Sequence, residues 1–312
     1  RVLVIGGGAA GMTAAISAAE HGHAVTLLEQ NEKLGKKIYI TGKGRCNLTN
    51  RLQEARFYHS ENPDFPRPAL ERFGFEETLR FFGELGLFFK ERDGYVYPRS
   101  SQAKAVREAL LSELSRRKAK IRTECAVKEI CRRPDGTFLI RAEETSFTAD
   151  AVILACGGMA APFTGSDGSG YRLAEALGHS LIPPVPALTG LFAVSSPLQK
   201  AAGVRTDGTI SLYVGEAGNR RLFGRDTGEL QLTEYGVSGI PAFQVSRYAA
   251  RALSEGKPAA AELNFLPEYG REQGEALLSR AFSGEEECFR ILCGLFPEKL
   301  AAVLLKRAGI PL

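Results

Sequence analysis

Apolar runs alternate with longer helical patterns along the first 185 residues, and this alternation predicts an α/β domain. The first strand is expected at Val2–Ile5, an Ala-rich helix at Met12–Glu20 and the second strand at Ala24–Leu28. Ala151–Ala155 is continuously apolar, which is typical of a strand buried on both faces. The remaining elements expected here are helices over 67–73, 75–85, 103–118 and 171–178 and strands over 121–123, 126–130 and 138–142.

A proline-rich stretch, Pro183–Pro186, interrupts this pattern and predicts a domain boundary. Beyond it, short apolar strands separated by Gly, Asp and Asn turns indicate a β domain, and helical patterns follow. The expected strands cover 188–194, 210–214, 221–223, 229–232 and 259–265, and the expected helices cover 240–253 and parts of 271–308. We therefore expect two domains, residues 1–185 and 186–312.

The turn after the first strand carries Gly6, Gly8 and Gly11, spaced as G-x-G-x-x-G between a strand and a helix. In this motif the first glycine allows a tight turn, and the second lets the backbone approach a pyrophosphate. The third lets the helix pack closely on the strand. The helix N-terminus at Ala9 and Ala10 offers N–H groups and a partial positive charge to phosphates.

Glu29 ends the second strand, at the distance from the glycines where an acidic side chain binds ribose hydroxyls. A carboxylate at this position favours a free 2′-hydroxyl and disfavours a 2′-phosphate. Motif, context and Glu29 together predict a dinucleotide site. The alternative is an α/β turn that needs glycines only for its own packing.

The composition is that of an ordinary soluble globular protein, with 44% hydrophobic and 24% charged residues among 312. The net charge of +4 is too small to predict nucleic-acid binding, and no apolar run is long enough to predict a membrane span. The chain enters a strand at once and its six cysteines are scattered, so we expect no signal peptide and a cytoplasmic location. His21 and His23 lie in a turn and no other pattern completes a zinc set, so no metal site is expected.

Several strings of residues are similar to one family of flavoproteins. They are Lys33–Lys37, Ile40–Asn50 with its G-x-G-R-C-N-x-T-N sequence, Tyr95–Ser100, Ala155–Gly158 and Thr233–Gly239. On these residues the chain resembles, through nearly its whole length, the BaiN/RdsA-type flavoproteins, also called aminoacetone-oxidase-like FAD-binding enzymes. The resemblance implies an α/β fold with a Rossmann-like FAD-binding domain, here 1–185. It also implies an inserted β-barrel-like plus helical domain, here 186–312.

The resemblance further implies which residues meet the cofactor. The loop 41–50 runs beside the flavin, where Arg45 and backbone N–H groups would stabilise negative charge at the N1/C2=O end of the reduced ring. The alternative is a solvated basic loop. Ala155–Gly158 would pass the adenosine and pyrophosphate, or be a plain strand end, and Val127 would meet adenine through its backbone. The cofactor-binding set is Gly6, Gly8, Ala9, Ala10, Gly11, Glu29, Gln30, Lys37, Thr41, Gly42, Gly44, Arg45, Cys46, Asn47, Val127, Ala155, Cys156, Gly157 and Gly158. The catalytic candidates are Arg45, Asn47 and Ser238.

Three residues and the C-terminal end of the chain carry open alternatives or departures from the family pattern. No second cysteine stands near Cys46, which favours a packing role over a redox thiol. Ser238 precedes a helix and is either part of an anion-binding N-terminus over the flavin or a simple helix cap. Glu234 stands where other members often carry His, so a proton donor is not expected there. Family chains close the flavin site with a C-terminal Gly-Asp segment. This chain ends at Leu312 without one, so we expect it to hold FAD weakly.

The sequence therefore predicts an FAD-dependent oxidoreductase that transfers a hydride or electrons on a small organic substrate. No second G-x-G-x-x-G follows a strand, so a dedicated NAD(P)H domain is not expected and NAD(P)H is a candidate transient donor. The alternatives are an NAD-dependent dehydrogenase that uses the first site directly, and an RNA-binding or RNA-modifying flavoprotein. The mild charge and the lack of a basic stripe weigh against nucleic acid.

Overall fold

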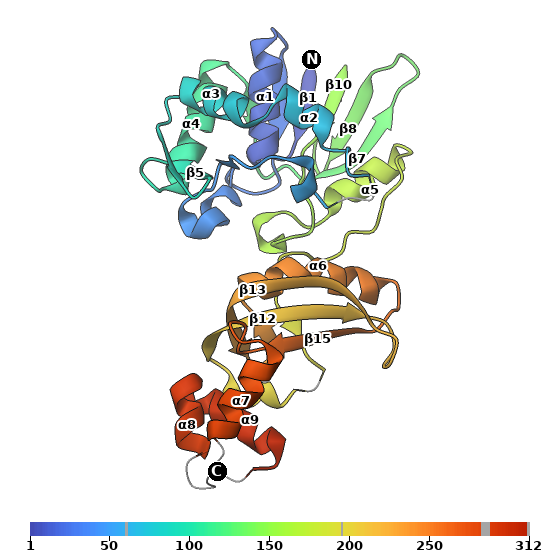
Figure 1. Ribbon diagram of the computed structural model, residues 1–312. Coiled ribbons are helices and arrows are strands. Elements are labelled where there is room, and N and C mark those ends of the chain that lie inside the picture. The colour runs from blue at the N-terminus through green and yellow to red at the C-terminus, as the bar shows by residue number, and fades with distance from the viewer. Residues whose placement is uncertain (60–61, 195, 282–287, 311–312) are drawn as a thin grey trace. The chain divides into compact units, whose positions relative to one another are not determined.

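The computed structural model describes residues 1–59, 62–194, 196–281 and 288–310. The chain divides into two compact units, Arg1–Ile182 and Pro183–Leu312 (Figure 1). Each unit has its own hydrophobic core, so each is described by itself.

A parallel sheet forms the centre of the first unit. Its order is β10-β1-β2-β6, made of β10 (Ala151–Leu154), β1 (Val2–Ile5), β2 (Val25–Leu28) and β6 (Lys120–Arg122). The register sets Ile5 opposite both Leu28 and Leu154, so these three strands end side by side. Their following residues, Gly6, Glu29 and Ala155, consequently meet at the carboxyl edge of the sheet, where open α/β sheets bind ligands.

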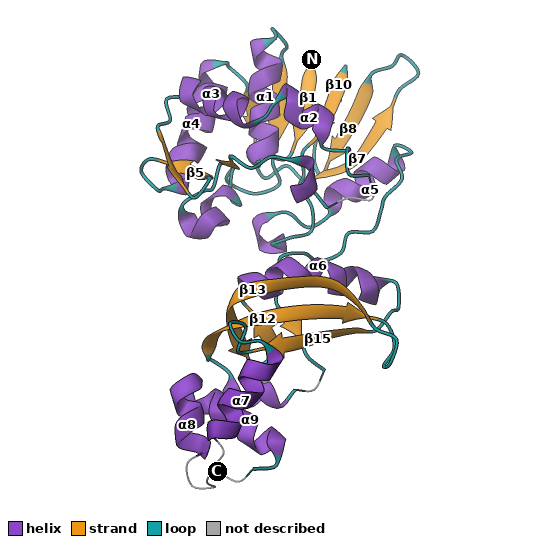
Figure 2. Cartoon of the chain, in the orientation of Figure 1, coloured by secondary structure: helices purple, strands orange, loops and turns teal. Residues whose placement is uncertain are grey.

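Helices cover one face of this sheet and a β-meander covers the other (Figures 1 and 2). Helix α1 (Ala9–Glu20) joins β1 to β2 and packs with α4 (Ala103–Arg116) around buried Met12 and Leu110. The opposite face packs on a three-stranded antiparallel sheet and on α5 (Ser169–Ala176). The strands of that sheet are β7 (Val127–Arg132), β8 (Phe138–Ala142) and β9 (Ser146–Ala149).

Strand β10 departs from the prediction that it is buried on both faces. Ala151 is exposed and the other three residues are only partly buried. The physical reason is its place at the edge of the sheet, because among the described residues β10 pairs with β1 alone. Continuous apolar character therefore identified a strand but not a central one.

A smaller layer of short elements lies between β2 and α4 in the chain. It contains the antiparallel sheet β3-β5-β4, whose strands are β3 (Thr49–Asn50), β5 (Tyr95–Pro98) and β4 (Phe89–Arg92). The helices are η1 (Ile38–Gly44), η2 (Ala55–Phe57), α2 (Arg67–Arg72) and α3 (Phe75–Glu84), and η3 (Pro162–Thr164) follows β10. The β4–β5 hairpin was not predicted, because three of the four β4 side chains are charged and exposed and give no apolar alternation.

The second unit is built on an antiparallel sheet of order β11-β14-β13-β12-β15, which in the described residues is open at β11 and β15. The strands are β11 (Leu191–Phe192), β14 (Gly236–Ser238), β13 (Arg221–Thr233), β12 (Arg205–Val214) and β15 (Ala259–Asn264). Helix α6 (Ile240–Ser254) packs on β12 and β13. Its other helices are η4 (Pro197–Ala201), α7 (Arg271–Ala281), α8 (Cys288–Leu295) and α9 (Glu298–Ala308), and η4, α8 and α9 share a core with the sheet.

One long strand, β13, replaces the two short strands predicted at 221–223 and 229–232. Glycines at 224 and 228 suggested a turn, but both lie within the strand. A Cβ at Gly224 would lie 2.6 Å from Cε2 of Tyr248, so this glycine makes room for an aromatic ring of α6. The fold class is nevertheless confirmed: a parallel Rossmann-like core with additional antiparallel sheets. Within the described ranges, no helix has the length and apolar character to cross a membrane.

Candidate functional site

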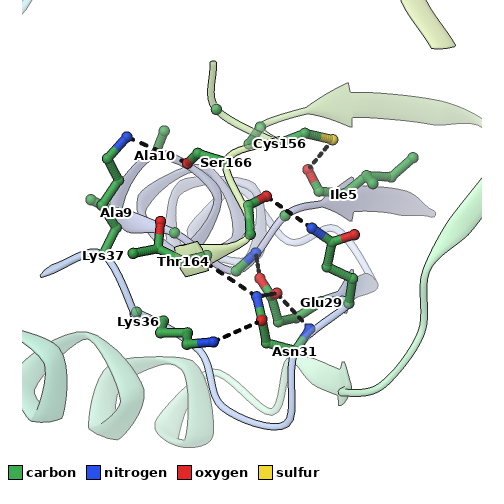
Figure 3. Close-up of a pocket in the computed structure, with 18 of the residues that line it drawn as sticks. Ile5, Ala9, Ala10, Glu29, Asn31, Lys36, Lys37, Cys156, Thr164 and Ser166 are labelled. Carbon is green, nitrogen blue, oxygen red and sulfur yellow. Dashed lines mark hydrogen bonds between the residues drawn. The ribbon is translucent and has the colours of Figure 1, made fainter. Parts of the chain in front are cut away.

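A cavity of about 270 Å³ opens at the carboxyl edge of the parallel sheet (Figure 3). Its walls come from the ends of β1, β2 and β10, from the start of α1, and from the loops that follow β2 and β10. The lining contains twelve of the predicted cofactor-binding residues: Gly6, Gly8, Ala9, Ala10, Glu29, Gln30, Lys37, Thr41, Val127, Ala155, Cys156 and Gly157. Segments from three distant parts of the chain thus meet in one site.

The glycine turn is closely packed at Gly6 and Gly11 and open at Gly8. At Gly6, φ is +106°, and a Cβ there would lie 2.4 Å from the carbonyl oxygen of Ala155. At Gly11 a Cβ would lie 1.8 Å from the Gly6 carbonyl oxygen, so this position fixes the close packing of α1. A Cβ at Gly8 would meet no atom within 4 Å. Gly8 therefore faces open space, and no side chain caps the α1 N-terminus above it.

Glu29 is buried at the end of β2, with 8% of its surface exposed. The backbone N–H of Gly7 donates to Oε2 at 2.7 Å, which joins the carboxylate to the glycine turn. The backbone N–H and the Nδ2 of Asn31 both donate to Oε1, at 2.8 and 2.6 Å. A carboxylate has about four lone-pair sites, so the protein itself occupies three of them and leaves about one for a ligand.

Lys37 supplies a positive charge to the cavity wall. Its Nζ donates to the carbonyl oxygen of Ala160 at 2.8 Å and to Oγ of Ser166 at 3.4 Å. Figure 3 shows this side chain reaching toward Ser166, with Ala9 and Ala10 of α1 nearby. Both partners are neutral, and Lys37 takes part in none of the ion pairs found in the described ranges. Its charge is therefore available to an anion.

The thiol of Cys156 lies in the same cavity wall and is expected to be a poor nucleophile. Burial, together with the nearby carboxylates of Glu29 and Asp167, raises its pKa to about 11. Its Sγ also donates to the carbonyl oxygen of Ile5 at 3.5 Å. Burial likewise raises the pKa of the Cys125 thiol, which lines the cavity too. Both thiols are neutral at pH 7, and a neutral thiol is a poor nucleophile.

The other predicted residues lie elsewhere. Gly11 packs behind the glycine turn, and Gly42, Gly44, Arg45, Cys46, Asn47 and Gly158 are outside the cavity lining. Cys46 is 7% exposed within the α1–α4 core, and burial raises its pKa, so its surroundings are those of a packing residue. Arg45 and Asn47 are exposed, and Ser238 belongs to β14 of the second unit. Over the described residues, no group of three metal-ligating side chains was found.

Several lining residues were missed from the sequence, chiefly Asn31, Lys36, Cys125, Thr164, Gly165, Ser166 and Ser169. A signal existed for the last four, because residues 164–170 form a Gly- and Ser-rich polar run a few residues after the Ala155–Gly158 strand end. The sequence gives no such signal for Asn31, because the contact that its side-chain amide makes in the cavity wall is with Thr164, 133 residues away.

The chain is similar in sequence to one protein family and to several named proteins. The family model described as the HI0933-like protein Rossmann domain matches residues 1–252. The chain is 49% identical to the 3-dehydro-bile acid delta(4,6)-reductase of Clostridium scindens, over 99% of this chain and 76% of the relative. It is 28% identical to the ribosomal RNA dihydrouridine synthase of Haemophilus influenzae, over 98% of this chain and 74% of the relative. Among solved structures, a flavocytochrome c3 fumarate reductase in an open conformation matches with a TM-score of 0.43 and 17% identity. That match covers 66% of this chain and 46% of the other.

Proposed function

The chain belongs to the HI0933-like family, and we propose that it is an FAD-dependent oxidoreductase that acts on a small organic substrate. The resemblance to BaiN/RdsA-type flavoproteins, inferred from the sequence, is confirmed by the family match and the relatives. One observation carries the cofactor assignment most directly. Gly8 faces open cavity beside an uncapped helix N-terminus, and a dinucleotide pyrophosphate would take up the space that a side chain at this position would enter.

The residues present fit the ADP half of FAD. The N–H groups at Ala9 and Ala10, with the ammonium of Lys37, would bind the pyrophosphate. The remaining lone pair of Glu29 would accept a ribose hydroxyl, and the backbone near Val127 would meet adenine. When bound, the isoalloxazine supplies hydride and electron transfer, while the protein supplies position and electrostatics.

The residues outside the cavity stay predictions as contacts of the flavin half. They include Gly42, Gly44, Arg45, Asn47 and Gly158. Arg45 is exposed, so its guanidinium is accessible to a ligand, as both the flavin role and the solvated-loop alternative require. We also propose that residues 186–312 form an insert with the substrate-binding role, in which Ser238 is a catalytic candidate.

A 3-dehydro bile acid is the substrate class we propose, because the relative that is 49% identical carries that activity in its name. NAD(P)H is the proposed transient donor, and the cytoplasm the proposed location. A ribosomal RNA substrate is the second candidate, since a relative with 28% identity is named for it. The formal net charge of +4 favours the small molecule over RNA.

The test is a two-step reduction with the full-length protein under nitrogen. The purified protein should show the visible absorption of oxidised flavin, and NADH or NADPH should bleach it. Addition of a 3-dehydro-4,6-diene bile acid should restore the absorption and yield the reduced steroid, whereas ribosomal RNA should not. Protein that stays colourless after incubation with FAD but binds NADH would instead support the NAD-dependent dehydrogenase. Reoxidation by RNA alone would favour the RNA-modifying reading.

A further inference from the structure

The segment 159–168, called the strap below, lines the cavity through Thr164, Gly165 and Ser166 and is held in place by side chains from elsewhere. Nε2 of Gln30 donates to the carbonyl oxygen of Gly165 at 2.8 Å. Nδ2 of Asn31 donates to that of Thr164 at 3.3 Å. Lys37 donates to the carbonyl oxygen of Ala160 and, more weakly, to Ser166. Three side chains that follow β2 thus fasten a segment more than 120 positions later in the chain.

Among these three, Asn31 alone also holds Glu29. Its backbone N–H and its Nδ2 both donate to Oε1 of Glu29, and the same Nδ2 reaches the carbonyl oxygen of Thr164 (Figure 3). Its Oδ1 accepts from Nζ of Lys36 at 3.4 Å, and its backbone carbonyl accepts from the N–H of Glu124 at 3.1 Å. The residue is therefore held by four partners, three of which contact its side-chain amide. One small side chain links the proposed ribose-binding carboxylate to the strap.

The Glu29 carboxylate has few free acceptor sites for hydrogen bonds, so the link through Asn31 matters for ligand binding. With three of about four lone-pair sites used by Gly7 and Asn31, a single direction remains for a ribose hydroxyl. Asn31, on Oε1, and Gly7, on Oε2, together therefore fix where that lone pair points. If the strap moved, the shared Nδ2 would lose one partner and the orientation of the Glu29 carboxylate would change with it.

The strap packs closely against the side-chain amides of Asn31 and Gln30 at Gly165. A Cβ at Gly165 would lie 2.4 Å from Nδ2 of Asn31 and 3.2 Å from Nε2 of Gln30, and φ at Gly165 is +94°. A side chain at this position would push the strap away from both amides while leaving Glu29 and Asn31 chemically intact. Gly165→Ala should consequently loosen the strap, as removal of the Asn31 or Gln30 side chain would.

We propose that Asn31 is a positioning residue that couples recognition of the adenosine ribose by Glu29 to closure of the strap over the bound nucleotide. The inference rests on the proposed function, in that it takes FAD as the occupant of this cavity. Because a coupling free energy acts equally in both directions, a ribose hydroxyl on Glu29 favours the closed strap and a closed strap strengthens the ribose contact. Loosening the strap should then weaken discrimination between ribose and deoxyribose, although the strap itself donates nothing to Glu29.

The experiment uses ADP and its 2′- and 3′-deoxy analogues as probes of the full-length protein, with FAD release followed by flavin fluorescence. The variants are Asn31→Ala, Gln30→Ala and Gly165→Ala. Lys33→Ala is the matched control, since Lys33 is an exposed polar residue of the same segment that pairs with Glu32. Calorimetry gives the affinities, and hydrogen exchange of residues 163–167 reports strap closure.

In the wild type, one deoxy analogue should bind about 10- to 100-fold more weakly than ADP, the loss expected for a hydrogen bond to a charged group. All three variants should shrink that ratio severalfold and speed FAD release, and ADP should protect the strap from exchange more than the deoxy analogue does. Lys33→Ala should match the wild type. The decisive variant is Gly165→Ala, because it displaces the strap without removing a side chain, whereas Gln30 is itself a predicted cofactor contact in the cavity wall.

An unchanged ratio and release rate in Gln30→Ala and Gly165→Ala would refute the coupling while the wild type still binds FAD and ADP. A wild-type protein that binds neither nucleotide would refute the proposed function and with it the coupling. If Asn31→Ala fails to fold, the other two variants decide the matter alone. Equal strap protection by ADP and both deoxy analogues would also overturn the proposal.

Discussion

A methyl group added at Gly8 should separate cofactor binding from folding. Gly8 has φ −76° and ψ −172°, which alanine adopts without strain, and its added Cβ would meet no protein atom within 4 Å. Reduced freedom of the unfolded chain stabilises such a variant by about 0.4–1 kcal/mol, while alanine is a poorer helix N-cap than glycine by a similar amount. The stability of the FAD-free protein should therefore change little. The methyl group would, however, enter the volume assigned to the pyrophosphate, where overpacking costs about 1–3 kcal/mol.

That cost corresponds to an FAD affinity about 5- to 150-fold lower. The matched control is Gly11→Ala, the same chemical change three residues later. Its Cβ would lie 1.8 Å from the Gly6 carbonyl oxygen, so that variant should lose stability even without FAD. Urea unfolding of the FAD-free proteins and fluorescence titration with FAD measure the two effects. Wild-type FAD affinity in Gly8→Ala would show that the pyrophosphate does not pass over this residue.

Four further predictions concern single side chains of the site. Glu29→Ala should weaken ADP and FAD by about 10- to 100-fold through the lost charge-assisted bond, measured by calorimetry, and unchanged affinity would remove Glu29 from the ribose site. Lys37→Met should weaken ADP more than adenosine, because only ADP carries the phosphates, and an equal loss for both would assign Lys37 to the strap alone. Arg45→Met should leave the melting temperature of the FAD-free protein within about 2 °C, since exposed substitutions stay within about 0.5 kcal/mol, yet should shift the flavin potential; a stability loss without that shift favours a solvated structural loop. For Cys156, a folded pKa of about 11 above the ordinary 9.0 means that the neutral thiol is favoured, so its contribution to stability is complete below pH 9 and is lost as the pH rises toward 11. Iodoacetamide should accordingly label Cys156 slowly at pH 8 and faster toward pH 11, and mass spectrometry showing rapid labelling at pH 7 would contradict the burial argument.

The parts of the fold that the sequence predicted are those set by local rules. The βαβ unit at the N-terminus combines an apolar strand, a glycine turn and an Ala-rich helix, and each of these signals lies within a few residues of the structure that it specifies. Two of the errors arise where the packing of distant residues determines the structure. Gly224 looks like a turn residue, but its missing side chain serves the Tyr248 ring of another element. Ala151–Leu154 has the composition of a central strand, but its neighbours make it an edge.

The residues of the site also differ in whether local sequence or long-range packing determines their role. Cofactor contacts at Gly6, Gly8 and Glu29, which line the cavity, stay predictions, but these positions were predictable because a dinucleotide motif specifies them by local sequence. Asn31 was not, because nothing local distinguishes an amide two positions after the strand from an ordinary turn residue. Its importance comes from Glu29 on one side and Thr164 on the other, and only the folded sheet brings these together. Local sequence thus places the cavity at the carboxyl edge of the sheet. The proposed closure of the strap over the cavity depends instead on the contact between Asn31 and Thr164, which are 133 residues apart in the chain. We expect substitutions in the glycine turn to change whether a nucleotide binds, and substitutions around Asn31 to change how long it stays.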